Sequence, residues 1–155
     1  MSVLPPGREA PEIDVLDHHR RKRRLQDFRG DHLALVFHRG TQDPDSVMIL
    51  ERLRDKQELF RSRGIRIAAI STEDIEVLAR FASDRRIEFP LLSDIDGEAA
   101  ETFGVHDGTG AKRVTFLIDD TGGIDRTYED PDPKLHADEL LQDAKFFTRT
   151  MHRGG

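Results

Sequence analysis

Two uninterrupted apolar segments, residues 33–37 (LALVF) and 65–70 (IRIAAI), constrain the fold of this chain more than any other feature. Neither segment alternates cleanly between apolar and polar residues, which is typical of strands covered on both faces in the centre of a parallel sheet. Between them, apolar residues recur at helical spacing over residues 44–63, and Gly64 is a natural stop for that helix. A strand, a helix and a second strand in this order predict a right-handed crossover between parallel strands.

The rest of the pattern completes an α/β architecture. We expect an extended lead-in over residues 1–11, a short strand around 13–16, a helix capped by Thr72 and continuing to 82, an edge-like strand at 89–92, a short helix at 97–103, strands at 114–118 and 124–128, and a helix from Leu135 to Met151. The turn signal at 119–123 (DDTGG) makes the last two strands an antiparallel hairpin. This order predicts a thioredoxin-like three-layer α/β fold, with helices on both faces of a central mixed sheet. We expect one domain over residues 1–155.

Charge and hydropathy limit the partners of the chain. Charged residues make up 35% of it and the formal net charge is -6, which argues against a general binder of nucleic acid or of anionic membranes. The basic run at 18–24 (HHRRKRR) is expected to be a solvated hairpin tip, because it lacks the interleaved aromatic residues that stack on bases. No apolar stretch is long enough for a bilayer, and no signal peptide is evident. We therefore expect a cytoplasmic protein.

The chain contains no cysteine, which excludes disulfides, thiolate metal sites and a cysteine nucleophile. His18, His19 and His38 are the nearest approach to a metal-binding set. Adjacent histidines on a strand point to opposite faces, so we expect surface histidines here, without a metal. No cofactor is expected either.

Five segments, in order along the chain, carry a resemblance to a known family. They are residues 7–11 (GREAP), 25–30 (LQDFRG), 35–40 (LVFHRG), 89–94 (FPLLSD) and 113–119 (RVTFLID). They resemble G-x-x-A-P, L-x-D-F-R-G, L-V-F-Y-R-G, F-P-L-L-S-D and R-x-T-F-L-I-D of the peroxiredoxin, or alkyl hydroperoxide reductase/thiol-specific antioxidant, family. This resemblance implies a thioredoxin-like fold with a peroxiredoxin-type N-terminal extension. The activity of that family is peroxidase, or oxidoreductase, chemistry, and its members often form dimers, so a homodimer is expected here.

The sequence departs from the family at the active-site loop. Where the family has W-C-P-x-C, this chain has residues 42–46 (QDPDS). On that pattern Asp43 stands at the first cysteine and Ser46 at the second, which is the peroxidatic position. Arg113 matches the family arginine that helps to activate the thiolate.

The replacements change what the loop can do chemically. Peroxide reduction needs a thiolate that becomes a sulfenic acid, and a serine hydroxyl has no such chemistry. Asp43 is instead a good N-cap, followed by Pro44 at the first helical position and Asp45 in the first turn. Two carboxylates there would raise the pKa of a neighbouring thiol. The loop is therefore better suited to capping than to catalysis.

These observations support a cysteine-less peroxiredoxin-like protein without thiol peroxidase activity, acting as a binding, regulatory or scaffold module. Arg39, Thr41 and Arg113 are the candidate binding residues, although Arg113 facing Asp43 favours a structural ion pair. One alternative is an enzyme of different chemistry using the degenerate pocket of Ser46, Asp43, Arg39 and Arg113. A second is an antioxidant oxidoreductase in which Ser46 is an engineered cysteine replacement, and a third borrows the thiol of a partner. A homodimer and a protein partner are the expected interactions.

Overall fold

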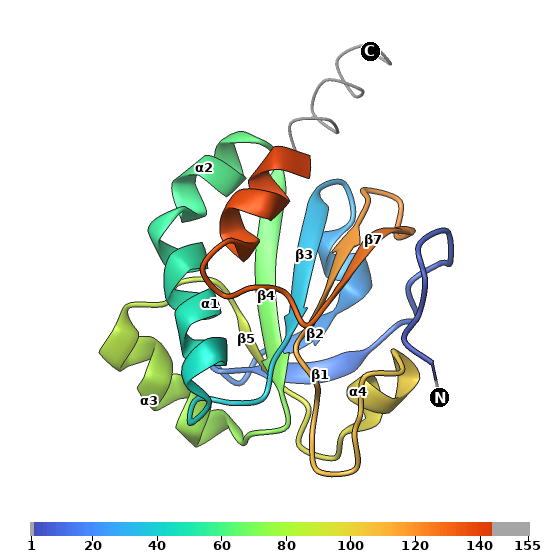
Figure 1. The fold of residues 1–155 in the computed structure, drawn as a ribbon. Helices are drawn as coiled ribbons and strands as arrows, with labels where there is room; N and C mark the ends of the chain where they lie inside the picture. The colour runs from blue at the N-terminus through green and yellow to red at the C-terminus, as the bar shows by residue number, and fades with distance from the viewer. Residues whose placement is uncertain (1, 144–155) are drawn as a thin grey trace.

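The computed structural model describes residues 2–143, and a seven-stranded sheet runs through the centre of this part of the chain (Figure 1). The strands are β1 (Asp14–Asp17), β2 (Lys22–Arg24), β3 (His32–Phe37), β4 (Ile65–Ser71), β5 (Leu91–Ser93), β6 (Val114–Ile118) and β7 (Ile124–Glu129). Their order across the sheet is β2-β1-β5-β4-β3-β6-β7. β4 runs parallel to both β3 and β5, and the other pairs are antiparallel. The predicted mixed sheet is thus confirmed.

Helices cover both faces of this sheet. They are α1 (Pro44–Asp55), α2 (Gln57–Ser62), α3 (Ile75–Arg85), α4 (Glu98–Thr102), the 3-10 helix η1 (Leu25–Phe28) and a helical segment at 136–143. α1, α2, α3 and the 136–143 segment lie on one face, whereas α4, η1 and the N-terminal lead-in lie on the other (Figure 1). Side chains of β3 alternate between the two cores, with Ala34 and Val36 in the first and Leu35 and Phe37 in the second. The fold is therefore the predicted three-layer, thioredoxin-like α/β arrangement.

The helix expected over residues 44–63 is interrupted, so that prediction is wrong in its continuity. Lys56 leaves helical geometry at φ -110° and ψ 13°, and its backbone N–H donates to the carbonyl of Leu53. Leu53 and Phe60 on either side of the break are both fully buried. The bend between α1 and α2 thus keeps both halves packed on the same core. Gly64, at φ +71°, follows the second half as expected.

Two finer predictions are also wrong. The N-cap of α3 is Asp74 and not Thr72, because the Asp74 carboxylate accepts the N–H of Val77 at 3.1 Å. The strand expected at the sheet edge, β5, lies inside the sheet between β1 and β4. β1 adds to its outer side, pairing Leu16 with Ser93, and this contact between distant segments leaves no local sequence signal.

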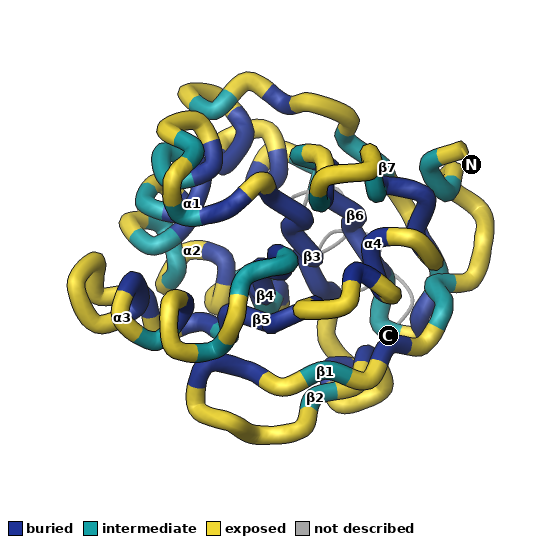
Figure 2. Tube along the Cα trace, turned by 90° about the horizontal axis from the view of Figure 1, so that it is seen from below, coloured by how far each residue is buried: buried dark blue, intermediate teal, exposed yellow. Residues whose placement is uncertain are grey.

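The basic run forms a turn and then the edge strand β2, which is far more exposed than the central strands β3 and β6 (Figure 2). The last helix begins within one residue of its predicted start, and the expected positions 144–151 lie outside the described residues. Among residues 2–143, no helix is long and apolar enough to cross a membrane.

Candidate functional site

The candidate site is built at the start of α1, directly after β3. Asp43 has extended backbone geometry, and its carboxylate accepts the backbone N–H of Ser46 at 3.1 Å. Pro44 occupies the first turn, where its missing N–H costs nothing, and Asp45 adds a second carboxylate near the helix N-terminus. The predicted capping role of this loop is confirmed.

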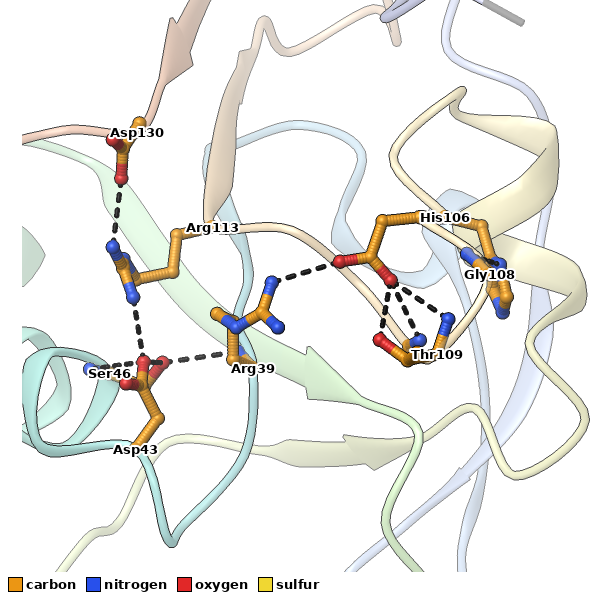
Figure 3. A network of polar contacts seen from close by, with 10 residues as sticks. Arg39, Asp43, Ser46, His106, Gly108, Thr109, Arg113 and Asp130 are labelled. Atoms are coloured by element: carbon orange, nitrogen blue, oxygen red, sulfur yellow. Dashed lines mark hydrogen bonds and ion pairs between the residues drawn. The ribbon is translucent and has the colours of Figure 1, made fainter.

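Ser46 is fully buried, and its hydroxyl has partners on both sides. Oγ donates to Oδ2 of Asp43 at 2.6 Å and accepts the backbone N–H of Arg39 at 3.1 Å (Figure 3). A hydroxyl carries a single donor, so this bond uses the whole donor capacity of Ser46. Ser46 thus joins the segment that follows β3 to the start of α1.

Arg113, just before β6, completes this cluster from the other side. Its Nη1 donates to Oδ2 of Asp43 at 2.8 Å, and its Nη2 donates to Oδ1 of Asp130 at 2.9 Å (Figure 3). The Asp45 carboxylate lies 3.8 Å from Nη2. The predicted ion pair is therefore confirmed, while the contribution of Asp130 was not predicted. Within the described residues, the buried Nε of Arg113 has no hydrogen-bond partner.

The electrostatics of the cluster favour the charged forms. Burial opposes ionisation of Asp43, but hydrogen bonds from Ser46 and Arg113 outweigh it and leave the pKa of this carboxyl below its usual value. Burial likewise opposes the charge of Arg113, and the bonds to Asp43 and Asp130 outweigh it, so the pKa of Arg113 is raised. Asp43 therefore stays ionised at neutral pH beside the Ser46 hydroxyl.

Arg39 links this cluster to a neighbouring loop. Its backbone contacts Ser46, whereas its side chain points away and donates to Oδ2 of Asp107 at 3.0 Å (Figure 3). Asp107 closes its own turn by accepting the backbone N–H and hydroxyl of Thr109. These bonds to Thr109, and then the one from Arg39, lower the pKa of Asp107. The sequence at residues 107–110 (DGTG), an aspartate followed by glycines and a threonine, could have predicted this turn.

Thr41 belongs to a different arrangement. Its backbone N–H lies 3.0 Å from both carboxylate oxygens of Glu73, and its hydroxyl donates to the same carboxylate at 2.7 Å. Ser71 donates to Glu73 as well. Gly40 permits this close approach, because a Cβ there would lie 3.2 Å from the Glu73 side chain and its φ is +122°. Thr41 is therefore held by Glu73, and its assignment as a binding residue stays a prediction.

His38 is buried directly below this loop, with 1% of its surface exposed. Its Nδ1 accepts the N–H of Gly40 at 3.1 Å, and Nε2 has no partner within residues 2–143. Burial lowers the pKa of His38 to about 4, although the carboxylates of Glu73 and Asp43 oppose the shift. His18 is also buried, at 7% exposed, so the prediction of surface histidines is wrong for both residues. Within the described chain, no three His, Asp or Glu side chains are close enough to hold a metal ion.

A cavity of about 420 Å³ lies beside the cluster. Arg39, Lys112 and Arg113 line it together with two carboxylates, Glu129 and Asp130. The structure therefore brings two of the three candidate binding residues to one cavity and places Thr41 elsewhere.

The fold and this loop define the class of protein. The AhpC/TSA family model matches residues 6–127, and the chain belongs to that family. It is similar to peroxiredoxin Bcp of Escherichia coli strain K12, with 31% identity over 149 residues that cover 91% of this chain and 96% of the relative.

Solved structures agree with this assignment. Peroxidoxin BcpB from Mycobacterium tuberculosis superimposes with a TM-score of 0.85 at 28% identity, covering 92% of this chain and 97% of that protein. The reduced 2-Cys peroxiredoxin of Plasmodium vivax has a TM-score of 0.86 at 17% identity, over 97% of this chain and 86% of its own, and shares the fold.

Proposed function

We propose that this chain is an AhpC/TSA family member without thiol peroxidase activity of its own, and that it acts by binding. The observation that carries the proposal is the state of Ser46. The residue at the peroxidatic position is fully buried, and its hydroxyl donates to an ionised carboxylate. Neither the atom nor its surroundings supply the soft anionic nucleophile that peroxide reduction requires.

The same geometry disfavours an enzyme of different chemistry at this site. A serine nucleophile needs a base that removes its proton, and a carboxylate with a lowered pKa is a poor base. The ring of His38 accepts from Gly40 through Nδ1, and no bond joins it to Ser46 within the described residues. We therefore assign the site to structure and binding.

The binding proposal rests on the 420 Å³ cavity and its arginines. Arg39 has 43% of its side chain exposed, and Asp107 is its one ion-pair partner within residues 2–143, so Arg39 can turn toward a bound anion or an acidic side chain of a partner protein. Arg113 is held rigidly by its carboxylates and contributes a fixed wall. We also propose that residues 1–155 act as one domain, in the cytoplasm and as a homodimer. Sedimentation velocity tests the oligomeric state.

A coupled peroxidase assay tests the absence of catalysis. The purified chain is incubated with hydrogen peroxide or an organic hydroperoxide and a thioredoxin-based reducing couple, and NADPH consumption is followed. We expect the rate of the protein-free mixture. Turnover above that rate by the unmodified chain would contradict the proposal.

Two variants separate the missing nucleophile from its altered surroundings. Ser46→Cys restores the thiol beside the Asp43 carboxylate, which raises the thiol pKa, so we expect little or no turnover. Ser46→Cys combined with Asp43→Asn keeps an N-capping side chain, removes the carboxylate and frees Nη1 of Arg113. We expect the double variant to be the more active of the two.

The matched control is Ser62→Cys, which introduces a thiol at an exposed position of α2. It reports the background reactivity of any added cysteine. Equal rates for Ser46→Cys and the double variant would show that Asp43 does not suppress a thiol at this position.

A further inference from the structure

A second cavity, of about 310 Å³, lies away from the Ser46 cluster, behind the turn that joins β1 to β2. It exists because β5 begins to pair with β4 only at Ala69. The first residues of β4, 65–67, are therefore open toward that side, and they form one wall. The β1–β2 turn, α2 and residues 88–90 form the others.

One carboxylate fixes the β1–β2 turn, which lines this cavity. Asp17 is fully buried, and its Oδ1 accepts the backbone N–H groups of His19 at 2.8 Å and Arg21 at 3.0 Å. Its Oδ2 accepts Nε–H of Arg23 at 2.9 Å. Arg20, at φ +65°, completes the reversal. The turn is thus held in one conformation by internal bonds, and binding there has little ordering cost.

The cavity has a surplus of positive charge. Four arginines line it, from the β1–β2 hairpin, α2 and β4, against two carboxylates, Asp17 and Glu88. Asp17 is already neutralised by Arg23. In the part of the chain that the structure describes, the Arg21 guanidinium has no carboxylate partner. Among the described residues, Arg61 pairs only with Glu58, an exposed residue of its own helix. This surplus is unexpected in a chain whose net charge is -6.

The interior of the cavity is partly apolar. Ile65, Ile67 and Phe89 line it and are nearly fully buried. His18 and His19 also line the cavity, and the centroids of their rings lie 4.2 Å apart. An apolar interior with a few convergent cationic groups is typical of a site for a small organic anion, and 310 Å³ lies at the lower end of the usual range for such sites.

We propose that this cavity binds a small phosphate-bearing anion, with Arg21 and Arg61 as its phosphate contacts. Guanidinium groups donate paired hydrogen bonds that match phosphate oxygens, and Arg21 has all of its side-chain donors available in the described structure. The small volume of the cavity and the overall negative charge of the chain favour a small ligand over a nucleic-acid strand. The site is independent of the proposed function of the Ser46 cluster.

Isothermal titration calorimetry of the full chain tests the proposal with inorganic pyrophosphate, ATP and adenosine. We expect saturable binding of pyrophosphate and ATP and none of adenosine. If ATP binds more tightly than pyrophosphate, the adenosine part of ATP contacts the apolar interior of the cavity. If the two bind equally, the phosphates alone are recognised. Both outcomes support the site. Binding of adenosine as tightly as ATP would overturn it.

A matched pair of double variants locates the binding. Arg21→Gln with Arg61→Gln removes the two proposed contacts and leaves Arg23, which holds Asp17, in place. We expect at least about tenfold weaker binding, which corresponds to about 1.4 kcal/mol. The control variant is Arg20→Gln with Arg52→Gln. Arg20 lies in the same turn as Arg21, Arg52 lies on α1 next to α2, and both are exposed arginines that do not line the cavity. We expect its affinity to stay within about twofold, since long-range charge effects are screened by salt.

Three further results would overturn the proposal: no saturable binding of either phosphate compound, equal weakening in both double variants, or tighter binding of a single-stranded oligonucleotide than of pyrophosphate. Circular dichroism of each variant establishes that it is folded. If Arg21→Gln with Arg61→Gln fails to fold, Arg61→Gln alone, which changes one exposed side chain of α2, replaces it.

Discussion

Each of two regions of this molecule is organised around its own aspartate, which lies beside arginines. In one region the charges are balanced, and in the other a surplus of positive charge remains. In the Ser46 cluster, Asp43 accepts bonds from Ser46 and Arg113, and Arg113 is further paired with Asp130. In the cavity behind the β1–β2 turn, Asp17 holds Arg23 and the turn backbone.

The two regions differ in the number of carboxylates that lie near each arginine. Three carboxylates lie within ion-pair distance of Arg113, so its charge is balanced inside the protein. Behind the turn, one buried carboxylate and one exposed carboxylate face four arginines. The charges around Ser46 are thus balanced inside the protein, whereas the cavity behind the β1–β2 turn keeps a surplus of positive charge. The following predictions test that contrast.

Asp17→Ala has the largest expected effect. It removes three hydrogen bonds from a carboxylate with 1% of its side chain exposed, and it leaves Arg23 without its partner. We expect a loss of about 4 kcal/mol in the free energy of unfolding, measured by urea denaturation. Asp14→Ala is the control, because Asp14 is exposed and lies 3.9 Å from Arg24. If Asp17→Ala cost less than about 1 kcal/mol, the turn would not depend on this carboxylate.

Lowering the pH has the next largest expected effect, through His38. Its pKa is about 4 in the fold against 6.5 in a model peptide, so between these values the unfolded chain binds the proton and the folded chain does not. The contribution is complete above pH 6.5 and is lost as the pH falls to 4, at about 1.4 kcal/mol per pH unit. This amounts to a loss on the order of 3 kcal/mol.

His38→Gln isolates that contribution. Urea denaturation from pH 7 to pH 4 should show a shallower loss of stability for His38→Gln than for the unmodified chain. His18→Gln makes the same change beside the arginine cavity, where burial and the neighbouring His19 lower the pKa of His18. A larger effect of His18→Gln than of His38→Gln on the pH dependence would reverse our ranking of the two regions.

Asp43→Ala should cost about 2 kcal/mol, less than Asp17→Ala. The substitution removes an N-cap, worth about 1 kcal/mol, and one of the partners of the half-buried Arg113. Arg113 keeps Asp130, which limits the loss. Asp45→Ala is the matched control in the same turn, with an expected cost below about 0.5 kcal/mol because its contact with Arg113 is long and exposed. Equal costs for the two variants would contradict the capping role of Asp43.

Arg39→Gln has the smallest expected effect, below about 1 kcal/mol in chemical denaturation. Its side chain pairs with Asp107 at a largely exposed position, whereas its contact with Ser46 uses the backbone N–H and survives the substitution. A larger cost would show that the side chain, and not the backbone, joins the two loops.

The sequence was sufficient for the cap but not for the complete cluster. Asp43, Pro44 and Asp45 predict a helix start from local chemistry alone. Asp130 depends on the β6–β7 hairpin, in which Val114 pairs with Glu129 and the residues just outside, Arg113 and Asp130, become neighbours. That register contains an irregularity between Leu117 and Ile118, which shifts the pairing by one residue. No local sequence pattern predicts this irregularity.

Histidine burial was unpredictable for a similar reason. The Nδ1 of His18 accepts the backbone N–H of Leu91, a residue 73 positions away, and the contact arises from the pairing of β1 with β5. Strand identities followed from apolar periodicity, whereas the order of the strands across the sheet followed from contacts between distant segments. The wrong prediction of β5 as an edge strand and the wrong prediction of His18 as a surface residue therefore have the same cause.

The edge strand β2 has a consequence for assembly. Its residues are Lys22, Arg23 and Arg24, and β2 forms one edge of the sheet, next to β1. If two copies paired antiparallel along this strand, cations would face cations at each position, and such pairs are destabilising. Lysine and arginine on an edge are a recognised protection against sheet extension and aggregation. The charges of β2 therefore disfavour edge-to-edge pairing of two copies, and the proposed homodimer would use a different surface.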